Sequence, residues 1–173
     1  DVKEVLKRAK DEVRRSSDRT RRLIEKVRDE SERVVEEVKK LNEDVNREVE
    51  RVIREVKGRD VVEEVRRRVE KLNRDNEKII KEDRDALEEI RRRLEESDKR
   101  LEDVIREIEK VIDDGKDIDT VLREVEKLVR DNERLVEKLV KEVEDSVRET
   151  KKRVEESVDT VRRIVEELKR RAT

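Results

Sequence analysis

Several chemically distinctive residue types are missing from this chain of 173 residues: Cys, His, Met, Pro, Phe, Tyr and Trp. Without cysteine there can be no disulfide. Zinc and haem sites in most proteins use Cys, His or Met ligands, and carboxylate-bridged di-iron bundles use Glu-x-x-His, so these sites are excluded. The lack of histidine also excludes Ser-His-Asp and Cys-His catalysis. We therefore expect no enzymatic activity, no metal and no cofactor.

Long apolar runs are missing as well. No more than two apolar residues are adjacent, as in Val34-Val35 and Ile79-Ile80, which is too few for a transmembrane helix or a signal peptide. The 50 basic and 52 acidic residues are interleaved and leave a net charge of −2. Runs of arginine have acidic neighbours, and no aromatic residue could stack on a base. We expect neither nucleic acid nor membrane as a partner, no natural localisation, and a soluble, cytoplasmic protein on recombinant expression.

Charged residues make up 59% of the chain and hydrophobic residues 31%, a balance typical of long helices in bundles and coiled coils. Only two glycines occur, Gly58 and Gly115, and each ends a helical pattern and precedes an aspartate. The pattern predicts helices at about 1–57, 60–113 and 118–172. Short connections make consecutive helices antiparallel. The expected fold is an all-α, single-chain, up-down-up three-helix bundle forming one domain over residues 1–173.

Helix starts are marked by acidic residues. Asp60 with Glu63 resembles a capping box, Asp1 with Glu4 repeats the pattern, and Asp117 is the expected N-cap of the third helix.

Inward-facing positions of the first helix, from Val2 and Val5 to Val56, recur about every 3.6 residues, whereas a left-handed coiled coil needs about 3.5. This period predicts nearly straight helices with little supercoil.

Polar residues interrupt the inward-facing stripes at three levels along the predicted bundle. Reflecting the chain at its glycines makes the numbers of facing residues sum to roughly 118 for the first two helices and roughly 230 for the last two. The expected members are Ser17, Thr20, Ser97 and Asn132 at one level; Ser31, Asp83, Ser146 and Thr150 at another; and Asn42, Asn46, Asn73, Asn76, Ser157 and Thr160 at the third. The residues expected to face one another are Thr20, Ser97 and Asn132; Asn42 and Asn76; Asn46, Asn73 and Ser157; and Asp83 and Ser146.

These levels have two interpretations. They could line polar pockets for a ligand, or they could form hydrogen-bond networks that fix helix register and topology. A buried polar group without a partner costs roughly 1–3 kcal/mol, so polar residues from different helices gain by meeting at one level. A narrow three-helix core leaves no obvious room for a ligand, which favours the structural interpretation.

The chain resembles computationally designed helical bundles with buried hydrogen-bond networks. The resemblance covers the whole chain and rests on its acidic helix starts, single-glycine connections, Glu/Lys/Arg surface and polar levels. Natural spectrin-like triple helices share the topology but usually carry aromatic core residues, which are missing here. The resemblance implies a stable scaffold or one half of an engineered heterodimer.

Two functions therefore remain open. The first is a structural scaffold: a closed, thermostable monomer with no natural biochemical activity, in which the polar levels specify register and topology. The second is a three-helix component of a four-helix heterodimer, which binds a partner helix, or a second copy, in a groove between the first and third helices.

Overall fold

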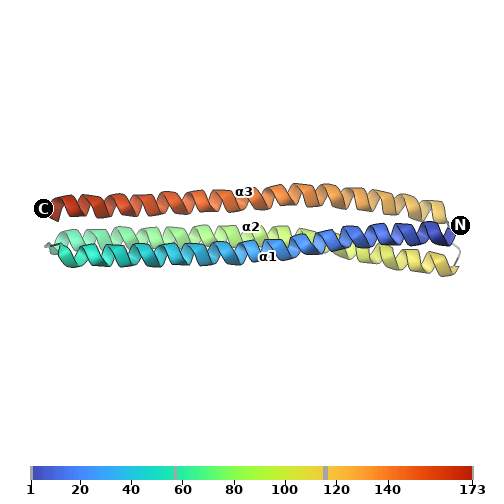
Figure 1. Cartoon of the computed structure of the whole chain (residues 1–173), viewed down its shortest axis with the longest axis horizontal. Coiled ribbons are helices and arrows are strands. Elements are labelled where there is room, and N and C mark those ends of the chain that lie inside the picture. The colour runs from blue at the N-terminus through green and yellow to red at the C-terminus, as the bar shows by residue number, and fades with distance from the viewer. Residues whose placement is uncertain (1, 57, 115–116, 173) are drawn as a thin grey trace. The chain divides into compact units, whose positions relative to one another are not determined.

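The computed structural model describes residues 2–56, 58–114 and 117–172. Three α-helices make up the described chain: α1 (Val2–Glu55), α2 (Arg59–Asp114) and α3 (Ile118–Ala172) (Figure 1). No strand occurs within those residues. The observed bounds lie within one or two residues of those expected from the sequence.

The chain folds as two compact units, and every helix contributes a segment to each. The first unit comprises Asp1–Asp29 and Leu87–Glu144, and the second comprises Glu30–Ala86 and Asp145–Thr173. In both units the segments of α1, α2 and α3 pack on one another, which confirms the all-α three-helix bundle. The prediction that residues 1–173 form one domain stays a prediction.

The core of the first unit is aliphatic and takes residues from all three helices. Leu6 and Val13 of α1, Leu101 and Ile108 of α2, and Val125 of α3 are each at most 1% exposed. Val2 and Val5, which the period places on the inward stripe, are 50% and 41% exposed. The first turn of α1 is therefore not covered by the core, although its apolar pattern continues to the helix start.

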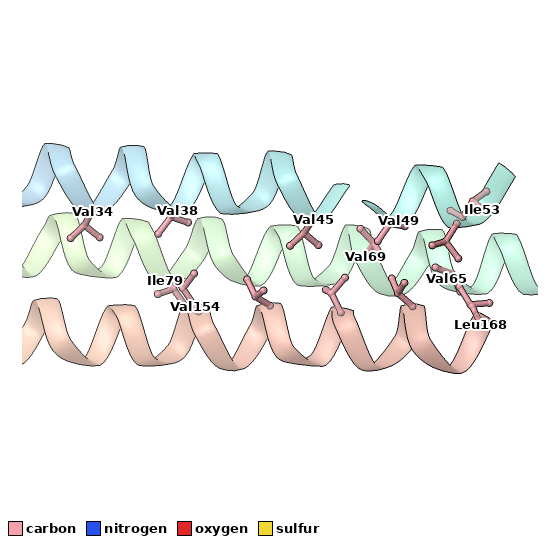
Figure 2. Packing of buried hydrophobic residues seen from close by; sticks show 14 residues of the cluster. Val34, Val38, Val45, Val49, Ile53, Val65, Val69, Ile79, Val154 and Leu168 are labelled. Atoms are coloured by element: carbon pink, nitrogen blue, oxygen red, sulfur yellow. The ribbon is translucent and has the colours of Figure 1, made fainter. Parts of the chain in front are cut away.

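In the second unit, valine dominates the core. Figure 2 shows side chains from the three helices meeting in this cluster, including Val38 of α1, Val69 of α2 and Val154 of α3. Branching at Cβ leaves valine few rotamers in a helix, so a valine core has few alternative packings.

Helix ends differ in part from the expected caps. α2 begins at Arg59, so Asp60 lies inside the first turn, and Gly58 takes the N-cap position with its carbonyl accepting the Val62 N–H at 3.2 Å. Gly58 has φ +153°, a conformation that residues with a Cβ rarely adopt. Asp117 directly precedes α3, as expected, and accepts a hydrogen bond from the Thr120 hydroxyl at 2.9 Å. The predictions for Asp1 and Gly115 lie outside the described residues.

Candidate functional site

Asn132 is the centre of a buried network in the first unit that joins all three helices. Its side chain is 3% exposed, and its Nδ2 donates to Ser16 Oγ at 2.6 Å and to Thr20 Oγ1 at 3.0 Å, both on α1. Its Oδ1 accepts from Ser97 Oγ on α2 at 2.5 Å. Thr20 in turn donates to the Ser16 carbonyl at 2.9 Å. Every polar atom of the Asn132 side chain is thus paired, which removes the main cost of burying an amide.

Ser17, expected at this level, belongs to a different cluster. It donates to Asp98 Oδ1 on α2, and Arg21 Nε donates to Asp98 Oδ2 at 3.1 Å. Arg21 also donates to Glu102. The hydrogen bond to Asp98, followed by the attraction of its charge, raises the pKa of Arg21 above its ordinary value. Ser16 and Asp98, which the sequence does not assign to the polar levels, are therefore members of the two clusters.

Asp83 lies in the core of the second unit, where it is 4% exposed. Two hydroxyls of α3, Ser146 Oγ and Thr150 Oγ1, each donate to Asp83 Oδ1 at 2.9 Å. The other carboxylate oxygen, Oδ2, has no hydrogen-bond partner among the described residues. This network is only half satisfied, in contrast to that of Asn132.

Ser31 was expected to join Asp83, but no hydrogen bond connects them in the part of the chain that the structure describes. Ser31 is half-buried on α1. The hydrogen bond between Asn42 and Asn76 defines the register of α1 against α2. Continuing that antiparallel register places Val35 opposite Asp83, one turn beyond Ser31. The carboxylate therefore receives its donors from α3.

Two asparagine pairs connect α1 and α2 in the second unit. Asn76 Nδ2 donates to Asn42 Oδ1 at 2.9 Å, and Asn73 Nδ2 donates to Asn46 Oδ1 at 3.2 Å. These are the facing residues given by the antiparallel register. Asn76 is 3% exposed, and its own Oδ1 has no partner among the described residues, whereas the other three asparagines are half-buried.

The α3 residues expected at this level are placed differently. Ser157 makes no hydrogen bond to Asn73; its Oγ is buried without a partner within the described ranges. Ser157 instead lines a groove of about 440 Å³ together with Asn76. Thr160 is exposed and donates to the Glu156 carbonyl of its own helix at 2.9 Å, so it is not a buried member of the level. Thr160 is at the edge of the inward stripe, where a small rotation of the helix decides between core and solvent.

Ion pairs cross every seam between helices in both units. In the first unit they are Lys10–Glu109 at 2.5 Å between α1 and α2, Arg19–Glu133 at 3.4 Å between α1 and α3, and Arg93–Glu142 at 3.4 Å between α2 and α3. In the second unit the corresponding pairs are Arg66–Glu50 at 3.8 Å, Lys151–Glu37 at 3.9 Å and Arg153–Glu82 at 3.0 Å. Pairs at or near the surface such as these contribute little stability, about 0–1 kcal/mol each, but they show which helix faces are adjacent.

Over the described residues, Asp and Glu side chains form no group of three or more that could hold a metal ion. Within the same ranges, no helix has an apolar stretch long enough to cross a membrane. No protein-family model, curated protein or solved structure matches the chain.

Proposed function

We propose that this chain is a designed structural scaffold without enzymatic activity, in which buried hydrogen-bond networks specify the register and topology of the helices. The observation that carries the proposal is the Asn132 network. It joins the three helices of the first unit through one amide whose donors and acceptor are all used. An apolar core tolerates small shifts of one helix along another, but a buried amide does not, because a shift would leave it unpaired.

The origin by design is supported by features of the whole chain. Three helices of nearly equal length are joined by very short connections, the core is aliphatic with no aromatic residue, and the surface consists of interleaved Glu, Asp, Lys and Arg. Each choice is one that design practice favours.

The seam between α1 and α3 bears on the alternative, a component that takes up a partner helix there. In the first unit this seam is bridged by the hydrogen bonds of Asn132 to Ser16 and Thr20 and by Arg19–Glu133. In the second unit Lys151 and Glu37 lie across it. A partner helix would have to separate these groups, so the contacts support the closed scaffold.

Light scattering coupled to size exclusion tests the scaffold. We expect a monomer at all concentrations and no binding of a hydrophobic dye. A dimer, or strong dye binding, would contradict the closed scaffold and favour an open groove.

A variant tests the role of the network. Asn132→Leu combined with Ser16→Ala, Ser97→Ala and Thr20→Val replaces the polar groups of the network by apolar ones of similar size. We expect this variant to remain helical but to lose a single well-defined structure, seen as broadened or doubled amide signals in NMR spectra. The matched control replaces Asn46 and Asn73, a half-buried pair, with alanine and is expected to keep one set of signals. An apolar variant with spectra as sharp as those of the parent protein would overturn the proposed role.

A further inference from the structure

Asn76 and Ser157 each carry a buried polar atom that has no hydrogen-bond partner among the described residues. The atoms are Asn76 Oδ1 on α2 and Ser157 Oγ on α3, both in the second unit. The two residues line the same groove, but these particular atoms are buried beneath its surface. A dissolved ligand therefore does not reach them in this arrangement.

The antiparallel register of α2 and α3 places these residues opposite each other. Thr150 donates to Asp83 at 2.9 Å. Moving seven residues back along α2 from Asp83 gives Asn76, and moving seven residues forward along α3 from Thr150 gives Ser157. Seven residues are close to two helical turns, so both side chains return to nearly the same face. Ser157 therefore lies opposite Asn76 across the α2–α3 seam, just as Thr150 lies opposite Asp83.

The two groups are chemically complementary. Asn76 already uses Nδ2 to donate to Asn42 on α1, which leaves its oxygen as a free acceptor. The Ser157 hydroxyl is a donor that rotates with χ1 among three staggered positions. Leaving both atoms unpaired costs free energy on both sides, and one hydrogen bond removes both costs.

We infer that a rotation of Ser157 about χ1 lets its hydroxyl donate a hydrogen bond to Asn76 Oδ1, which then joins Asn42, Asn76 and Ser157 in a network spanning all three helices. The inference assigns Ser157 a role in specifying register in the second unit, equivalent to that of Ser97 in the first. It deepens the proposed scaffold function and rests on it.

A double-mutant comparison tests the inference. Ser157→Thr keeps a hydroxyl, and Ser157→Val has the same shape without one. With Asn76 present, we expect the ratio of folded to unfolded protein to be about fivefold lower for the valine variant than for the threonine variant, as one hydrogen bond dictates. With Asn76→Leu, which has no acceptor, we expect this difference to vanish or to reverse. Guanidinium melts of the four proteins measure both ratios.

Thr160 supplies the matched control, because it is exposed and its hydroxyl already donates to Glu156. Thr160→Val is expected to have the same effect whether residue 76 is Asn or Leu. The inference is overturned if the threonine–valine difference at residue 157 is equal in both backgrounds, or if valine is preferred in both. Such a result would not contradict the scaffold proposal as long as light scattering shows a monomer. The scaffold proposal and the inference about Ser157 can therefore fail separately.

Discussion

Thr150 donates its hydroxyl to Asp83 Oδ1 at 2.9 Å, and Ser146 donates to the same oxygen. The second carboxylate oxygen receives no hydrogen bond from any described residue, although Asp83 is 4% exposed. A buried carboxylate loses its hydration and regains only part of that free energy here. Asp83 is therefore a buried group that does not maximise the stability of the second unit.

Replacing Asp83 tests how much its carboxylate contributes to the stability of the fold. Asp83→Leu removes an incompletely paired carboxylate, and the two stranded hydroxyls can turn back to carbonyls of their own helix. We expect this variant to be as stable as the parent or more stable. Asp83→Ala loses the acceptor and adds a void, so we expect a loss of about 1–3 kcal/mol. Denaturant melts of both variants give the answer. If leucine proves the worse substitution, the carboxylate is strongly stabilising and the argument is wrong.

Asn132 is expected to matter more than the asparagines of the α1–α2 seam. Asn132→Ala removes the partner of the Ser97 and Ser16 hydroxyls and leaves a void, so we expect a loss of about 2–4 kcal/mol. Asn46→Ala removes one hydrogen bond at a half-buried position where water can replace it, and we expect a loss below about 1 kcal/mol. If urea or guanidinium melts show that both alanine variants lose the same free energy of unfolding, burial does not decide how much each asparagine stabilises the fold.

The fold was predictable because its determinants are local. Two glycines and a constant helical period define three helices, and the short connections between them require antiparallel neighbours. The same reflection identifies Asn42 with Asn76, Asn46 with Asn73, and places Thr20 and Ser97 around Asn132, because partners in straight antiparallel helices follow from numbering alone.

What could not be predicted is which of two adjacent buried residues meets a given partner. Ser16 and Ser17 differ by about 100° around the helix and both lie within the buried arc, so only the packed neighbours decide that Ser16 meets Asn132. Asp98 was missed because an acidic residue beside Lys and Arg has the pattern of a solvated surface. The sequence predicts that Ser157 faces Asn73, whereas Ser157 lines a groove with Asn76. The numbering rule for facing residues missed this because it is uncertain by about one helical turn.

Gly58 has a backbone requirement that can be tested separately from packing. A Cβ built at this residue would lie 3.8 Å from Val61 Cγ2, which is an ordinary contact, so space does not exclude a side chain. The backbone conformation does disfavour a side chain, because a φ of +153° is adopted essentially by glycine alone. We expect Gly58→Ala to cost about 1–3 kcal/mol in chemical denaturation. Arg59→Ala, at the first residue of α2, is the control and should change stability by less than about 0.5 kcal/mol. A neutral Gly58→Ala would show that the connection adopts another conformation.

Acid should weaken the fold through its ion pairs. The hydrogen bond from Lys10, followed by the attraction of its charge, lowers the pKa of Glu109, and the hydrogen bond from Arg91 lowers that of Glu88. Because these pKa values are lower in the folded state, the pairs stabilise it above the ordinary glutamate pKa of about 4.3 and lose that contribution as the pH falls below it. We therefore expect the denaturant midpoint to fall between pH 7 and pH 3.

Glu109→Gln isolates one of these contributions. The variant should show a smaller fall in the denaturant midpoint between pH 7 and pH 3 than the parent, and the difference should shrink in 1 M salt, where charges are screened. Glu137→Gln, at an exposed position of α3, is the matched control and should behave as the parent does. The same pH response in Glu109→Gln and the parent would show that the Lys10 pair does not contribute to acid sensitivity.

The thermal midpoint is the broadest test, because favourable and unfavourable features compete in it. The helices contain no proline, the only glycine in the described ranges lies between α1 and α2, and strong helix formers such as Glu, Lys, Arg and Leu fill much of the surface. The unpaired oxygens of Asp83, Asn76 and Ser157 oppose this by about a few kcal/mol in total. Helix propensity contributes over more than a hundred residues and the unpaired oxygens at only three, so propensity should dominate. We expect circular dichroism to show a midpoint well above the usual mesophile range of about 45–65 °C. A midpoint inside that range would mean that the half-satisfied core of the second unit limits the stability of the chain, and Asp83→Leu should then raise it.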